Sequence, residues 1–332
     1  MEFRSPMNSD ETVNVFFLGA GAFAVPVLEA LWKDPGIRLC GVGTQVDKAA
    51  GRKRILTPTP LGKWADDHGI DCQRIPSVNT PEFLDQVRAA APDIVVVVSF
   101  GQLLKMDLLS LPRFGCFNVH ASLLPRYRGA SPITTALLNG DEETGVAFMR
   151  MEKGLDTGPV YETHRLAISP EITTGELEQQ LAHLAGEHIG DALRRVANGL
   201  EPVPQPEEGV TIAVKIRKSD GSVDFREDAA VIARKVRAFH GWPSMTFRVM
   251  MKDRIHNVKI TRAKGTSWES PQAQPGEIIA YSNNQMMIRC GRGSLVVERV
   301  LPEGKKEMPV ADFLNGCRIS IGDILLNGQD KA

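Results

Sequence analysis

The stretch that decides the fold reads Asp93-Ile-Val-Val-Val-Val-Ser99. Five consecutive aliphatic residues predict a strand that is buried on both faces, and such strands are typical of parallel sheets. Two further apolar runs, Val13 to Leu18 and Ile37 to Val42, predict neighbouring strands. The first part of the chain should therefore contain an open, mostly parallel sheet with residues 93–99 at its centre.

Helical patterns separate these strands. Apolar residues recur at helical spacing in segments 22–33, 59–68 and 80–90, and Thr80 is placed to cap the last of these. A longer helical pattern covers residues 174–198. Strands that alternate with helices indicate right-handed crossovers and a Rossmann-like α/β fold. Ligands bind such folds beyond the carboxyl ends of the strands, so residues that follow strands are the first candidates for a site.

A proline-rich segment, Glu201 to Gly209, divides the chain. Its three prolines and lack of periodicity are typical of a semi-rigid linker. We expect residues 12–200 to form one domain. Short alternating segments over residues 210–332 predict a small OB-like β-barrel, interrupted by a helix at 229–239. Residues 1–11 are polar and are expected to form a flexible tail.

The overall composition excludes several classes of protein. Hydrophobic residues make up 42% and charged residues 24%, which is typical of a globular chain rather than a disordered or fibrous one. No run of about 18 apolar residues predicts a membrane span. The five cysteines are odd in number and form no C-x-x-C pair, which argues against disulfides and a structural zinc site. We therefore expect a cytoplasmic protein without a metal.

Charge is distributed unevenly along the chain. Residues 210–332 hold 20 Lys and Arg and 13 Asp and Glu, whereas the rest holds 19 and 27. This asymmetry is typical of an enzyme with a polyanion-binding appendage, although random drift of surface charge gives the same pattern. The segment 48–54 carries four cations and no acid, which predicts phosphate contact rather than a merely solvated loop. Its cations are Lys48, Arg52, Lys53 and Arg54.

A glycine-rich turn follows the first strand. Gly19-Ala-Gly-Ala-Phe-Ala24 fits the G-x-G-x-x-A pattern of a dinucleotide site. The acid that should bind the ribose about 20 residues later is absent, because the second strand ends at Gln45 and Asp47 lies in the following loop. A tight strand-to-helix turn is the simpler interpretation, and an NAD-dependent oxidoreductase is the weaker alternative.

The densest set of reactive residues lies between Phe117 and Gly129. Asn118 and His120 stand two apart on a predicted strand, so both side chains leave the same face. An amide and an imidazole aimed together can stabilise an oxygen that acquires negative charge. Asp156 stands in a glycine-flanked loop that could reach the same edge. Singly, each residue is also typical of a structural role; together they suggest direct acyl-type transfer without a covalent enzyme intermediate.

These motifs resemble the 10-formyltetrahydrofolate-dependent formyltransferases. The resemblance covers nearly the whole chain. In the first part it rests on Asn118-x-His120, Ser122-Leu-Leu-Pro125, Arg128-Gly129 and Leu155-Asp-Thr-Gly158. In the second part it rests on segments 218–225, 236–243 and 304–308. Two positions depart from the family pattern, since the first turn commonly reads Gly-Thr-Pro and the position of Tyr127 is often Trp.

The resemblance implies transfer of the formyl group of 10-formyltetrahydrofolate to the methionine amino group of initiator methionyl-tRNA. Asn118 and a protonated His120 would donate hydrogen bonds to the oxyanion of the tetrahedral intermediate, and Asp156 would keep His120 charged and relay a proton. The residues implied to bind the folate are Ser122, Leu123, Leu124, Pro125, Phe100 and Gly101. The resemblance also places Arg52, Lys53 and Arg54 against the tRNA acceptor arm.

Besides the oxidoreductase, three other functions stay open at this point. A nucleotide-sugar N-formyltransferase would use the same donor and the same three catalytic residues. Formylation of glycinamide ribonucleotide fits less well, because the enzyme for that reaction lacks a basic barrel. A non-catalytic RNA-binding module would bind tRNA without turnover. We expect a monomer with no membrane partner.

Overall fold

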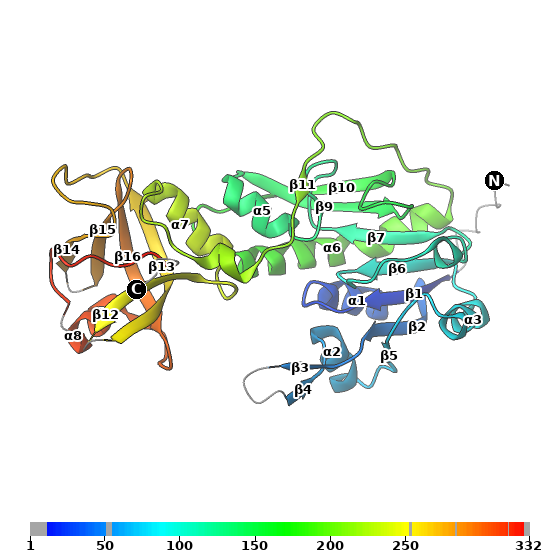
Figure 1. Cartoon of the computed structure of the whole chain (residues 1–332). Helices are drawn as coiled ribbons and strands as arrows, with labels where there is room; N and C mark the ends of the chain where they lie inside the picture. The colour runs from blue at the N-terminus through cyan, green and yellow to red at the C-terminus, as the bar shows by residue number, and fades with distance from the viewer. Residues whose placement is uncertain (1–11, 51–54, 252–253, 283, 318, 329–332) are drawn as a thin grey trace. The chain divides into compact units, whose positions relative to one another are not determined.

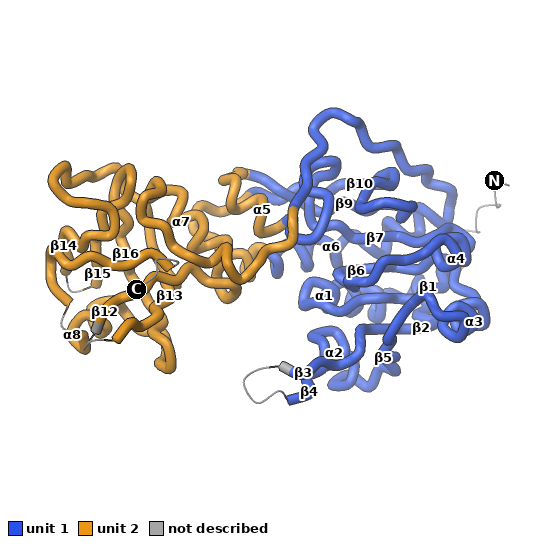
Figure 2. The backbone as a smooth tube through the Cα atoms, viewed as in Figure 1, with its two compact units in different colours: residues 1–132, 143–167, 178–213 blue, residues 133–142, 168–177, 214–332 orange. Residues whose placement is uncertain are grey.

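The computed structural model describes residues 12–50, 55–251, 254–282, 284–317 and 319–328. The chain divides into two compact units (Figure 2). Unit 1 contains the residues up to 132 together with 143–167 and 178–213, and unit 2 contains 133–142, 168–177 and 214–332. Each unit is built around its own sheet. The predicted domain boundaries at 201–209 stay a prediction.

Unit 1 contains a seven-stranded sheet in the order β10-β9-β7-β6-β1-β2-β5 (Figure 1). The five parallel strands are β1 (Val13–Gly19), β2 (Ile37–Gln45), β5 (Gln73–Ile75), β6 (Ile94–Val98) and β7 (Cys116–His120). Strand β6 is the fourth of the seven, and all its residues are buried. The predicted central strand is therefore confirmed.

Three strands of this sheet were not predicted: β5 at one edge, and two strands at the other side. Strand β9 (Glu143–Arg150) runs antiparallel to β7, and β10 (Val160–Ala167) runs antiparallel to β9. Strand β10 forms one edge of the sheet and mixes half-buried with exposed residues, so its sequence lacks the apolar run of the central strands. This antiparallel pair determines where the loop between β9 and β10 begins and ends.

The helices associated with unit 1 follow the predicted pattern, except for one short helix that was not predicted. They are α1 (Ala24–Lys33), α2 (Pro60–Asp67), α3 (Pro81–Ala90), the short α4 (Met106–Leu109) and the long α6 (Thr174–Ala197), whose first turn clusters with unit 2. The side chain of Thr80 accepts a hydrogen bond from the backbone N–H of Phe83, which confirms the predicted cap. Thr59 caps α2 in the same way. No helix in the described part of the chain is both long and apolar enough to cross a membrane.

Gly19 allows close packing at the end of β1. A Cβ atom at this position would lie 2.7 Å from the ring of Phe17 and 2.8 Å from the Cβ of Ala24. Only glycine fits this distance without displacing its neighbours. The glycine-rich turn thus has a packing reason that requires no dinucleotide.

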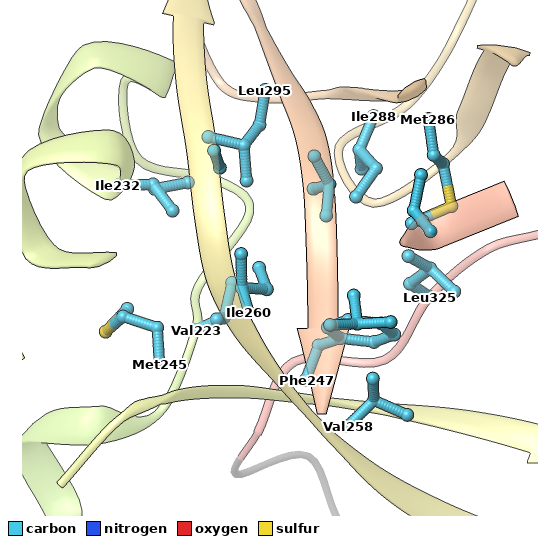
Figure 3. Packing of buried hydrophobic residues seen from close by; sticks show 14 of the residues in the cluster. Val223, Ile232, Met245, Phe247, Val258, Ile260, Met286, Ile288, Leu295 and Leu325 are labelled. Atoms are coloured by element: carbon cyan, nitrogen blue, oxygen red, sulfur yellow. The ribbon is translucent and has the colours of Figure 1, made fainter. Parts of the chain in front are cut away.

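Unit 2 contains an antiparallel sheet in the order β12-β13-β16-β15-β14, with β17 paired to β16. Its strands are β12 (Met245–Met251), β13 (Arg254–Thr266), β14 (Ile278–Ser282), β15 (Gln285–Arg289), β16 (Ser294–Pro302) and β17 (Met308–Pro309). Helices α5 (Pro132–Asn139), α7 (Ala229–Ala238) and α8 (Val310–Gly316) and the 3₁₀ turn η1 (Lys218–Gly221) accompany it. The core includes Ile232 from α7 and Phe247, Ile260 and Leu295 from the strands (Figure 3).

The C-terminal segment closes this sheet. Leu326 and Arg248 exchange two backbone hydrogen bonds of 2.9 and 3.0 Å, which attaches the segment to β12. On the other side, the N–H of Leu325 donates to the carbonyl of Gly276 at 2.8 Å, just before β14. The C-terminal segment thereby joins the two edges of the sheet, which agrees with the predicted OB-like barrel.

Candidate active site

Strand β7 places Asn118 and His120 on one face of the unit 1 sheet. Asn118 lies between Val97 of β6 and Met149 of β9, and His120 lies opposite Ala147 of β9. The intervening Val119 is buried and points to the other face. Asn118 is half-buried, whereas only 6% of His120 is exposed. The two polar side chains thus project side by side from a rigid strand.

Asp156 reaches this pair from the loop between β9 and β10. Its Oδ1 lies 3.5 Å from the Nδ2 of Asn118, and its Oδ2 lies 3.7 Å from the Nδ1 of His120. The loop begins at the amino end of β7, because Arg150 at the end of β9 pairs with Phe117. It then folds back toward the carboxyl end of β7. Asp156 therefore lies over the strand and does not arrive from the carboxyl edge.

Glycine at position 158 permits this return of the loop. A Cβ atom on Gly158 would lie 1.9 Å from the carbonyl oxygen of Arg150, which no side chain can tolerate. The backbone N–H of Arg150 also donates to the carbonyl of Pro159 at 2.9 Å. Asp156 itself has a positive φ of 53°. Such a conformation is uncommon for a non-glycine residue and clusters at functional sites.

The loop after β7 fixes the orientation of His120. Nε2 of His120 lies 2.9 Å from the carbonyl oxygen of Tyr127. Because a carbonyl oxygen can only accept a hydrogen bond, we assign the proton of the neutral ring to Nε2. The other ring nitrogen, Nδ1, therefore faces Asp156. Ser122 donates through Oγ to the carbonyl of Arg126 at 2.6 Å, and the N–H of Tyr127 donates to Oγ1 of Thr211 at 2.8 Å. These bonds hold the loop against the imidazole.

The carboxylate of Asp156 also accepts a backbone hydrogen bond. The N–H of Gly129 donates to its Oδ2 at 2.9 Å. Gly129 belongs to the short strand β8 (Arg128–Gly129), which pairs with β11 (Ile212–Ala213). Its φ is 115°, and a Cβ atom there would lie 2.7 Å from the carbonyl oxygen of Ala213. Glycine is therefore required at this contact.

Gln205 is a site residue that the sequence analysis missed. Its Nε2 donates to the backbone carbonyls of Asp156 at 2.9 Å and Gly158 at 2.7 Å. Its Oε1 accepts from Nε and Nη2 of Arg128 at 3.0 and 2.7 Å. The only signal in the sequence is a polar residue between Pro204 and Pro206, which is not specific. The proline-rich segment therefore lies against the site in unit 1.

The predicted folate-binding residues have mixed exposure. Ser122 is fully buried, and Leu123, Leu124 and Pro125 are half-buried. Only 2% of Phe100 is exposed, and its ring packs in the core of unit 1, so this residue can offer a ligand only its backbone. Their role in folate binding stays a prediction.

Gln45 connects the end of β6 with the start of the basic segment. Its Nε2 donates to the carbonyl of Phe100, and its Oε1 accepts from Nζ of Lys48 at 2.7 Å. Lys48 opens the strand β3 (Lys48–Ala50), which pairs with β4 (Ile55–Thr57), and its side chain is exposed. The three remaining predicted RNA contacts, Arg52, Lys53 and Arg54, lie outside the described residues.

A cavity of about 830 Å³ opens elsewhere in unit 1. Its lining includes Gly115, which precedes β7, and Tyr161 of β10, but not Asn118, His120 or Asp156. Burial raises the pKa of Tyr161 to about 12, so its hydroxyl stays protonated at neutral pH. Because its lining lacks Asn118, His120 and Asp156, this cavity is separate from the candidate active site. Within the described ranges, no three His, Cys, Asp or Glu residues are grouped so as to hold a metal ion.

Comparisons with known proteins identify the family of this chain. A formyl transferase family model matches residues 12–193, and a model of the formyl transferase C-terminal domain matches residues 215–318. A methionyl-tRNA formyltransferase of Myxococcus xanthus is 40% identical over 93% of this chain and 96% of its own length. One of Xanthomonas campestris pv. campestris is 41% identical over 92% of this chain and 98% of its own length.

Solved structures of lower identity share the fold. An N-formyltransferase of Helicobacter canadensis, solved with folinic acid and dTDP-3-aminofucose, has a TM-score of 0.61 at 17% identity and covers 86% of this chain and 99% of its own. HypX of Aquifex aeolicus, solved with tetrahydrofolic acid, has a TM-score of 0.57 at 15% identity and covers 90% of this chain and 46% of its own.

Proposed function

The chain belongs to the formyl transferase family, and from this premise we propose that it formylates the methionine of initiator methionyl-tRNA with 10-formyltetrahydrofolate. The relatives that match nearly the whole chain are named methionyl-tRNA formyltransferases, which supports this acceptor over a sugar nucleotide. The observation that carries the chemistry is the convergence of Asn118, His120 and Asp156 within 3.5–3.7 Å contacts.

The reaction exchanges one carbon–nitrogen bond for another. The neutral amino group of methionine attacks the formyl carbon, and the bond from that carbon to N10 of the folate then breaks. Negative charge develops on the formyl oxygen in between. Nδ2 of Asn118 and Nδ1 of His120 project from the same face of β7. Nδ2 donates to this oxygen as it stands, and Nδ1 donates to it when the imidazole is doubly protonated. Nε2 of His120 is already occupied by the carbonyl of Tyr127.

Asp156 has two tasks in this mechanism. Its carboxylate lies close enough to Nδ1 of His120 to stabilise an imidazolium. It also accepts the proton that the attacking amine loses and returns it to N10, directly or through water. The backbone N–H of Gly129 keeps the carboxylate in place during this transfer. The atoms balance, because the amine loses one proton and gains the formyl group while N10 does the reverse.

The chemistry of the surrounding residues fits a folate. Gly101 follows the carboxyl end of β6 and is exposed, so its backbone is open to the hydrogen-bonding edge of a pteridine. Leu123 and Leu124 are half-buried and offer apolar surface to its ring system. The fold neighbours solved with folinic acid and tetrahydrofolic acid support the same class of ligand.

The distribution of positive charge along the chain supports tRNA as the acceptor. A tRNA presents many phosphates, and residues 210–332 carry more basic than acidic residues. Lys48 and the neighbouring Arg52, Lys53 and Arg54 add four cations. A nucleotide sugar presents too few phosphates to require this charge. The expected consequence is a steep fall of acceptor affinity with salt.

A direct assay decides between the acceptors. The purified protein is given 10-formyltetrahydrofolate and either initiator tRNA charged with methionine or a panel of dTDP-linked amino sugars. We expect formylated methionine to form with tRNA and no product with the sugars. A higher kcat/KM with any amino sugar would reassign the enzyme, and tRNA binding without product would indicate a non-catalytic module.

A further inference from the structure

Gln205 connects two segments that surround the reactive carboxylate. Its amide nitrogen donates to the carbonyls of Asp156 and Gly158, and its amide oxygen accepts twice from Arg128. Arg128 adjoins Gly129, whose N–H binds the carboxylate of Asp156. One side chain therefore holds both the backbone that carries the carboxylate and the strand that hydrogen-bonds it.

The exposure of neighbouring residues sets Gln205 apart. Within residues 203–209, Gln205 is half-buried while every other residue is exposed. Prolines on both sides restrict the backbone and limit the directions that this side chain can take. Two backbone hydrogen bonds of 2.8 Å between Val203 and Val160 fix the segment just before it. The amide is thus directed at the loop of Asp156 by a well-anchored backbone.

From these contacts we propose that Gln205 is a positioning residue for catalysis, acting through Asp156. Asp156 has a positive φ of 53°, a conformation that Asp adopts more readily than most residues but that still needs support from the loop around it. The two hydrogen bonds from Gln205 to the carbonyls of residues 156 and 158 hold the loop in this conformation. Without them the loop relaxes, and the carboxylate moves away from Nδ1 of His120. The inference rests on the proposed formyl transfer.

Two substitutions separate positioning from simple attachment of the segment. Gln205→Ala removes all four hydrogen bonds. Gln205→Glu keeps an acceptor for Arg128 but sets a carboxylate oxygen against the carbonyls of residues 156 and 158. We expect both variants to lose kcat by about 10- to 100-fold, the range in which a misplacement of about 1 Å falls. Folate KM should stay within about threefold of wild type, because Asp156 acts in the chemical step. Gln86→Ala, at an exposed position of α3, is the matched control.

If Gln205 only attaches the segment through Arg128, the Glu variant will retain wild-type kcat, and the proposal is overturned. Because Glu matches Gln in size and keeps an acceptor for Arg128, the segment should stay attached, and the thermal unfolding temperature of the Glu variant should fall less than that of the Ala variant. If the Ala variant unfolds, the Glu variant carries the test alone.

A double-mutant cycle with Asp156→Asn tests the route of the effect. If Gln205 acts through the carboxylate, Gln205→Glu in the Asp156→Asn background should change single-turnover rates by less than about threefold. If Gln205→Glu lowers the single-turnover rate in the Asp156→Asn background as strongly as it does in the wild-type background, Gln205 acts by another route and the proposal is overturned. Failure of the proposed function is distinguishable, since the wild-type protein would then transfer no formyl group to methionyl-tRNA.

Discussion

Replacing Asn118 with Ala tests the oxyanion interpretation most directly. The change removes one donor at the position where negative charge develops, and loss of such a donor typically lowers kcat by about 10²–10³-fold. The effect on folding should be small, because the side chain is half-buried and its hydrogen bond to Oδ1 of Asp156 is long at 3.5 Å. We expect a stability loss of about 1 kcal/mol or less. The midpoint temperature of thermal unfolding should then fall by roughly 2–4 °C or less.

The assay compares chemistry with binding in the same preparation. Single-turnover formyl transfer to charged initiator tRNA gives the rate, and calorimetric titration with a folate analogue gives the affinity. Asn118→Asp is the matched variant, because it keeps the size but replaces the donor with a second carboxylate beside Asp156. Its rate should fall at least as far. An Ala variant within about threefold of the wild-type rate would remove Asn118 from the mechanism, and an equal loss of rate and folate affinity would refute its selective role in the transition state.

The remaining predictions concern loop geometry, pH and RNA binding. Gly129→Ala should lower both thermal stability and kcat, because its φ of 115° costs a side chain about 1–3 kcal/mol and its Cβ would lie 2.7 Å from the carbonyl oxygen of Ala213; unchanged unfolding and turnover would contradict this geometry. Burial and the stacked ring of His188 lower the pKa of His164, so the unfolded state binds its proton first, and stability should fall as pH drops below about 6.5. His164→Gln should flatten that fall in urea titrations, and an unaltered pH dependence would assign it to other groups. Replacing the three cations of residues 52–54 with Ala should weaken tRNA binding and lower the salt slope by up to about 2–3 while leaving folate binding unchanged; a parallel loss of folate binding would indicate misfolding.

Much of the sheet could be predicted because local patterns report burial. The aliphatic run at 93–99 predicted the central strand, and β6 occupies that place. Strand β10 was not predicted, because an edge strand with half-exposed residues has no comparable pattern. In the site, Asn118 and His120 were paired from their spacing alone, since alternate residues of a strand share a face.

The sequence by itself determined which residues are chemically suited to the reaction and where the buried central strands and the long helices lie. Only the tertiary structure decided that Asp156, 38 residues after Asn118, reaches the pair by folding back from an antiparallel strand. It also decided that Gln205, 49 residues further along, holds the loop of Asp156 from a segment that resembled a plain linker. Periodicity and capping act over a few residues, whereas contacts between distant segments depend on how the whole sheet packs and on which backbone groups are left to be paired.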